Sequence, residues 1–121
     1  MIRTFLILCL LTTGCATFDA QNATFKAQKA LSAYTDVQAK KSMPEMLLFN
    51  STREVKEIAE RFTGKKFKKP AFFHPSSKTI YVCKYAASKI VIHEVLHAYL
   101  SELFPKMTED EQHKLIGEWE Y

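Results

Sequence analysis

Two histidines and a glutamate stand at a spacing that suits a zinc hydrolase. His93 and His97 are four residues apart, and Glu94 directly follows the first of them. On a helix this spacing puts both imidazoles on one face, with Cβ atoms about 5 to 6 Å apart, so both can bind one metal ion. Glu94 is turned by about 100° from His93. Its carboxylate can therefore reach a water molecule on the metal without being a ligand.

The chemistry of such a site requires these residue types. Neutral imidazole is a good ligand for Zn²⁺, and the metal lowers the pKa of a bound water molecule to about 7. A carboxylate beside that water can take its proton and deliver it to a leaving amine. The pattern predicts Zn²⁺ as the cofactor, His93 and His97 as ligands and Glu94 as the catalytic base.

The alternative is that these side chains are core residues hydrogen-bonded to neighbouring backbone. They stand, however, in the most apolar stretch of the chain, where an unpartnered carboxylate would be costly. The corresponding alternative function is a non-catalytic envelope lipoprotein with a structural metal site or an interaction role. A catalytic zinc keeps an open position, whereas a structural zinc is closed by four protein ligands.

The motif is expected on a central helix that follows a β-hairpin. Segment 87–104 is predicted to be a helix that stops before Pro105. Its own apolar residues lie on nearly every side of the helix, so it is expected to be buried. The segments 71–74 and 79–83 are rich in β-forming residues and are joined by a polar turn, which predicts an antiparallel hairpin.

Three further helices are predicted over 22–40, over 52–63 and from the Thr108 region to the chain end. Ser51 and Glu54 form a capping-box pattern at the start of the second, and Gly64 is placed to end it. Thr108 and Glu111 form the same pattern at the last helix. The predicted fold class is α+β, mostly helical with a small antiparallel hairpin before the motif helix.

Residues 1–14 have the order of a secretory signal: Arg3, an apolar run over 5–11, and small residues before Cys15. The run is too short to cross a bilayer, which needs about 20 residues. The segment Leu11-Thr12-Thr13-Gly14-Cys15 resembles the lipobox of bacterial lipoproteins.

The lipobox resemblance implies lipidation at Cys15 and a place at the periplasmic face of the outer membrane. We therefore expect a signal over 1–14, a lipidated cysteine and tether over 15–24, and a single domain over 25–121. Membrane contact is then expected through Cys15.

Composition limits the other possibilities. With 121 residues, one domain is expected, and a net charge of +4 falls short of a nucleic-acid-binding footprint, so no nucleic-acid partner is expected. Cys9 and Cys15 lie near the N-terminus and Cys83 stands alone, so the body has no internal disulfide. The basic run 65–69 is typical of a solvated loop, or of a contact with anionic lipid heads or cell-wall polymers.

Over residues 55–121 the sequence resembles the zincin metallopeptidases, in particular small gluzincin-like members. The resemblance rests on a helix, a hairpin and a His-Glu-x-x-His helix followed by another helix. It implies zinc-dependent hydrolysis of peptide bonds, with Glu94 activating a zinc-bound water. The sequence does not resemble the metzincins, because Leu100 and Leu103 stand where that family has glycine and histidine.

The resemblance also implies a third zinc ligand on the last helix and a strand that pairs with the peptide substrate. Periodicity alone leaves Glu118 and Glu120 equivalent, and His113 is another candidate. The similarity of the segment 117–120 to the gluzincin ligand segment favours Glu118. Segment 79–83 resembles the substrate-pairing edge strand, with Thr79, Ile80 and Tyr81 as substrate-binding residues.

Overall fold

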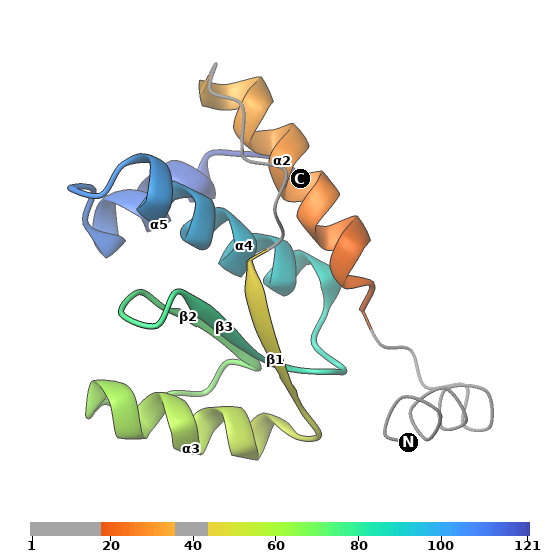
Figure 1. The fold of residues 1–121 in the computed structure, drawn as a ribbon, viewed down its shortest axis with the longest axis vertical. Helices are drawn as coiled ribbons and strands as arrows, with labels where there is room; N and C mark the ends of the chain where they lie inside the picture. The colour runs from red at the N-terminus through yellow and green to blue at the C-terminus, as the bar shows by residue number, and fades with distance from the viewer. Residues whose placement is uncertain (1–17, 36–43) are drawn as a thin grey trace.

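The computed structural model describes residues 18–35 and 44–121, and these form layers of helix, sheet and helix (Figure 1). The elements in chain order are α2 (Ala20–Thr35), β1 (Glu45–Phe49), α3 (Thr52–Thr63), β2 (Ala71–His74), β3 (Thr79–Cys83), α4 (Ser88–Leu103) and α5 (Glu109–Gly117). Helix α3 covers one face of the sheet and α4 the other, and both α2 and α5 pack on α4. This mixed helix and sheet content confirms the α+β class.

The sheet has three strands in the order β1-β3-β2. β2 and β3 pair antiparallel, with Phe72 opposite Tyr81, as the predicted hairpin requires. β1 pairs parallel to β3, with Leu47 opposite Tyr81. Because β3 is hydrogen-bonded on both sides, it is the central strand, and its prediction as a substrate-pairing edge strand is wrong.

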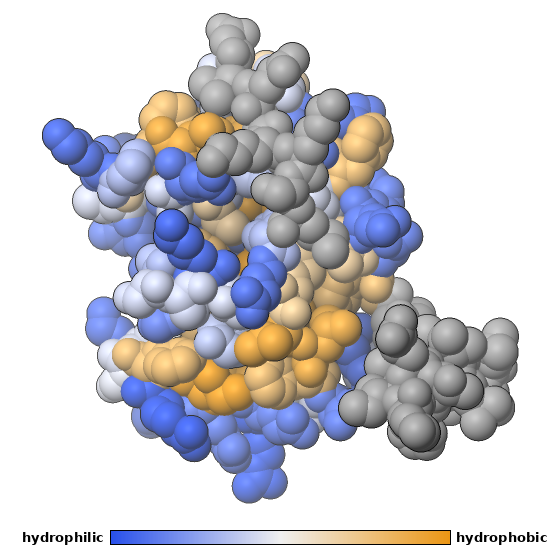
Figure 2. Space-filling model, in the orientation of Figure 1, coloured by the Kyte–Doolittle hydropathy of each residue, from blue (hydrophilic) through white to orange (hydrophobic). Residues whose placement is uncertain are grey.

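Strand β1 was not predicted, and its sequence explains why. Met46, Leu47, Leu48 and Phe49 are consecutive apolar residues without the alternation that indicates a half-buried strand. The strand lies at the edge of the sheet, so Leu47 and Leu48 remain exposed. Figure 2 shows the resulting hydrophobic surface over the lower part of β1. Its parallel pairing with β3 joins residues that are 34 positions apart in the sequence, such as Glu45 and Thr79. No local sequence pattern reveals such a pairing.

Helix α3 occupies the predicted residues. Ser51 Oγ accepts a hydrogen bond from the Glu54 backbone N–H at 3.3 Å, which satisfies a donor of the first turn. Gly64 ends the helix with φ 69°, and its N–H donates to the Glu60 carbonyl at 2.8 Å. A left-handed residue at this position is the usual reason for glycine after a helix.

The bounds of the other helices differ more. Helix α4 lies within one residue of its prediction at each end. Helix α2 begins at Ala20 rather than at residue 22, and the predicted part from 36 to 40 lies outside the described residues. Helix α5 has the predicted capping box of Thr108 and Glu111 but ends at Gly117, so the prediction that it reaches the chain end is wrong.

The main core lies between the sheet, α4, α2 and α5. Its fully buried side chains include Leu31, Ile80, Leu96, Leu100 and Ile116. Cys83 is buried in a smaller cluster beneath α3, as expected for a small hydrophobic residue. Within the described ranges no helix is long and apolar enough to span a membrane. The predicted signal and Cys15 lie outside these ranges, as do residues 16 and 17 of the predicted tether. Residues 20–24 of the predicted tether instead form the first turns of helix α2, where Ala23 and Thr24 are buried.

Two glycines give a matched test of this helix architecture. We expect Gly64→Ala to lower the free energy of unfolding by about 1 to 2 kcal/mol, because an L side chain is strained at its positive φ. Gly117→Ala, in helical backbone with open space around it, should raise the free energy by up to about 1 kcal/mol. Chemical denaturation measures both. Equal effects of the two substitutions would contradict the assigned cap.

Candidate metal centre

Three histidines converge where α5 crosses α4. His93 and His97 lie one turn apart on α4, and His113 comes from α5. One ring nitrogen from each lies within 4.8 Å of the other two. His97 is buried, His93 is half-buried and His113 is exposed, so the group reaches from the interior to the surface. Three of the four histidines of the chain therefore meet at one point.

The two α4 histidines turn the same nitrogen toward each other. His93 Nε2 and His97 Nε2 are 3.1 Å apart. Two imidazole nitrogens bound tetrahedrally to one Zn²⁺ at about 2.0 to 2.1 Å would be about 3.3 Å apart. The observed separation is close to that value, and a set of three nitrogen donors suits Zn²⁺. The residues present therefore fit a zinc ion.

The opposite nitrogen of each ring has its own partner. His97 Nδ1 donates to Gln112 Oε1 at 2.7 Å, and the Gln112 amide in turn donates to Ser101 Oγ at 3.0 Å. His93 Nδ1 lies 3.1 Å from the Tyr121 hydroxyl. Partners of this kind fix the ring orientation and tautomer of metal-binding histidines. Since Gln112 Oε1 can only accept, His97 carries its proton on Nδ1 and presents a lone pair on Nε2.

Burial keeps both α4 imidazoles neutral. Desolvation, together with the charges of His97 and His113, lowers the pKa of His93 from 6.5 to about 4. Desolvation also lowers the pKa of His97, opposed by its hydrogen bond with Gln112. A metal ligand must be the unprotonated form of the ring. These shifts leave both rings in the ligand form at neutral pH.

Glu94 is buried between α4 and the sheet. Its Oε1 accepts a hydrogen bond from the Phe73 backbone N–H of β2 at 2.9 Å. Desolvation raises the pKa of Glu94 from 4.5 to about 8, although the Phe73 N–H and the positive charge of Lys69 act in the opposite direction. A carboxyl group whose pKa is brought near neutrality is suited to take and return a proton.

The group opens on a cleft of about 1150 Å³. Glu94, His97 and His113 contribute to its lining, along with residues of the β2–β3 hairpin and the start of α5. In Figure 1 the turn of the hairpin and helix α5 both lie on the left, with the turn below α4. The cleft therefore reaches Glu94, His97 and His113, whereas His93 does not contribute to its lining. This arrangement suits an open site rather than a closed one.

The structure brings the predicted His93 and His97 into one group and places Glu94 in the lining of the adjoining cleft, but the third member of the group is His113 rather than Glu118. Glu118 is the exposed C-cap residue of α5 and does not belong to the group. Glu120 is also exposed, and its backbone N–H donates to the Tyr34 hydroxyl at 3.3 Å. Glu118 as a ligand remains a sequence prediction.

The orientation of α5 explains why hydrophobic periodicity could not identify the third candidate ligand. The buried residues of this helix are Gln112 and Ile116. Gln112 is polar, yet it is buried because it bonds His97 and Ser101. A search for apolar residues alone therefore misplaces the buried face. That face, once it includes Gln112, brings the adjacent His113 toward α4.

The predicted substrate-binding residues lie inside the sheet. Thr79 and Ile80 are buried, and Tyr81 stacks on Phe72 with ring centroids 5.0 Å apart. Their strand is paired on both sides, so it has no free edge to bind a peptide. The edge strand that faces the metal centre is β2, because its Phe73 N–H points to Glu94.

Comparisons of the chain with models of known protein families, with curated proteins and with solved structures found no match.

The raised pKa of Glu94 gives a test by stability. Between pH 4.5 and about 8, Glu94 keeps its proton in the folded protein but releases it in the unfolded chain. The free energy of unfolding therefore falls as the pH rises through this range. The lowered pKa values of His93 and His97 act in the opposite direction, but both histidines are present in the wild type and in Glu94→Gln, so a comparison of the two proteins isolates Glu94. In a chelating buffer from pH 6.5 to 8, the wild type should lose up to about 1.4 kcal/mol per pH unit relative to Glu94→Gln. Chemical denaturation measures this, and parallel stability curves would contradict the burial of an ionisable carboxyl.

The hydrogen bond behind His97 gives a second test. Gln112→Leu removes the acceptor that orients the ring, and we expect zinc affinity to fall by about 10- to 100-fold. Competition with a chromogenic chelator measures the affinity, and circular dichroism checks that the variant is folded. Unchanged affinity in a folded variant would show that Gln112 does not position the ring.

Proposed function

We propose that this chain is a zinc-dependent metallopeptidase. The observation that carries the proposal is a group of three imidazoles, two of which, His97 and His113, line an open cleft together with the buried carboxyl group of Glu94. His93, His97 and His113 would hold Zn²⁺, with His113 in the place that the sequence assigned to Glu118. Among the described residues, this is the one group of three or more such side chains within ligand distance of one another.

When bound, Zn²⁺ would act as a Lewis acid that polarises a peptide carbonyl and acidifies a water molecule, and its charge would favour the ionised form of Glu94. Glu94 takes a proton at its carboxylate and returns it to the leaving amine. The Phe73 N–H holds one carboxylate oxygen at 2.9 Å and so fixes the position of the group. Gln112 and Tyr121 hold the imidazoles from behind.

The cellular location belongs to the same proposal. The signal-like segment 1–14 and the lipobox cysteine Cys15 support lipid anchoring at the periplasmic face of the outer membrane. A peptide or protein in that compartment would be the substrate.

Substitutions at the centre separate metal binding from catalysis. Glu94→Gln should keep zinc and lower the rate of peptide hydrolysis by about 10²- to 10⁴-fold, because a general base is lost. His93→Ala and His113→Ala should lose zinc and activity together. Zinc analysis of the purified protein and a chelator-sensitive assay on quenched fluorescent peptides measure both properties.

Two controls keep this test specific. His74→Ala removes the one histidine outside the group and should keep a full zinc content. Glu118→Ala should also keep its zinc. Zinc loss in Glu118→Ala together with retention in His113→Ala would overturn the ligand set. Zinc binding without hydrolysis by the wild type would favour the non-catalytic alternative.

A further inference from the structure

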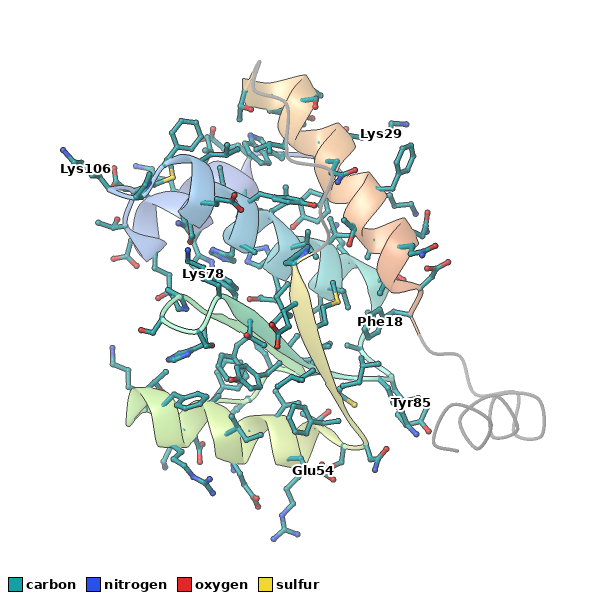
Figure 3. All side chains as sticks on the ribbon, viewed as in Figure 1. Phe18, Lys29, Glu54, Lys78, Tyr85 and Lys106 are labelled. Atoms are coloured by element: carbon teal, nitrogen blue, oxygen red, sulfur yellow. The ribbon has the colours of Figure 1, made fainter. Side chains whose placement is uncertain are left out.

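The cleft beside the metal centre is lined on its sheet side by five lysines, here called the lysine rim. They are Lys65, Lys66, Lys68, Lys69 and Lys78. Four come from the segment between α3 and β2, and Lys78 comes from the hairpin turn. Figure 3 shows Lys78 at the hairpin, on the side of the sheet that faces α4 and α5. All five are exposed, and none of them forms an ion pair with another residue of the described ranges.

The opposite side of the same cleft is acidic. Glu102 near the end of α4, with Glu109 and Asp110 at the start of α5, line it and are exposed. Glu109 Oε1 lies 3.7 Å from His113 Nε2, one turn away on α5. Positive charge therefore lies on the sheet side of the histidines and negative charge on the α5 side. Nearby charges of opposite sign on two walls orient a charged ligand as well as attract it.

The rim extends to the metal centre itself. Lys69 directly precedes Pro70 at the entrance to β2 and acts electrostatically on His93, Glu94 and His97. Glu109 acts on Glu94 and His97 from the other wall. A ligand at the histidines is therefore exposed to the positive charge of Lys69 and to the negative charge of Glu109.

We propose that the cleft binds an acidic peptide segment, whose carboxylates lie on the lysine rim while the adjoining uncharged or basic residues pass the α5 wall. This inference rests on the proposed peptidase function, for which it names the substrate class. The concave shape and the two signs of charge favour a peptide over a lipid surface. A flat anionic bilayer would meet Glu109 and Asp110 together with the lysines, whereas a peptide can match each wall in turn.

The test uses the full chain and three labelled peptides of equal length. One carries a block of four glutamates next to a neutral segment, one carries glutamines in their place, and one carries lysines. Fluorescence anisotropy at low salt measures binding with and without zinc. We expect the acidic peptide to bind about tenfold more tightly than the neutral one, and this advantage to shrink as salt is added.

Paired variants locate the interaction. Lys69→Gln with Lys78→Gln should remove most of the preference for the acidic peptide. Lys56→Gln with Lys114→Gln makes the same change in net charge at exposed positions of α3 and α5 that do not line the cleft. This control should keep the preference. Equal losses in both double variants would show attraction by net charge alone and would overturn the proposal.

The outcomes distinguish this inference from the function on which it rests. Zinc-dependent cleavage of all three peptides with no preference in binding would overturn the acidic-peptide site and leave the peptidase. Rim-dependent binding without any cleavage would support the site and overturn the peptidase. Vesicles containing phosphatidylglycerol provide the last arm. Tighter, rim-dependent binding to vesicles than to the acidic peptide would replace the peptide by a lipid surface and overturn the proposal.

Discussion

The site depends on the burial of ionisable side chains within the central helix of the fold. His97 and Glu94 are 4% and 7% exposed, so each must find a polar partner inside the protein. Glu94 finds the Phe73 N–H of β2, and His97 finds Gln112 of α5. These two bonds attach α4 to the sheet on one side and to α5 on the other. The packing of the layers and the geometry of the candidate metal centre therefore rely on the same contacts.

The same bonds also determine how protons are placed. Gln112 can only accept at Oε1, so the proton of His97 is held on Nδ1 and the lone pair of Nε2 faces His93. Without a cation, this lone pair is satisfied when His93 Nε2–H donates to it and the Tyr121 hydroxyl donates to His93 Nδ1. If a cation were held by both Nε2 atoms, His93 would carry its proton on Nδ1 and the Tyr121 hydroxyl would be the acceptor. Rotation of one hydroxyl and a change of one tautomer are enough to satisfy both states.

Much of this arrangement could be predicted from short sequence patterns, because its parts are local. The spacing of His93 and His97 on a helix, the hairpin and the caps of α3 and α5 each depend on residues within a few positions of one another. The parallel strand β1 and the third histidine could not be predicted in this way. β1 depends on pairing across α3 and the hairpin, and the position of His113 depends on the rotation of α5 about its axis.

That rotation is set by a polar residue, which is why hydrophobic patterns did not reveal it. Ile116 packs in the core, and Gln112 on the same face reaches both His97 Nδ1 and Ser101 Oγ on α4. An unsatisfied amide in this position would cost about 1 to 3 kcal/mol. The two hydrogen bonds therefore choose one orientation, and in that orientation the next residue, His113, lies with its ring centroid 4.5 Å from that of His97. The bond that orients the His97 imidazole thus also places that of His113.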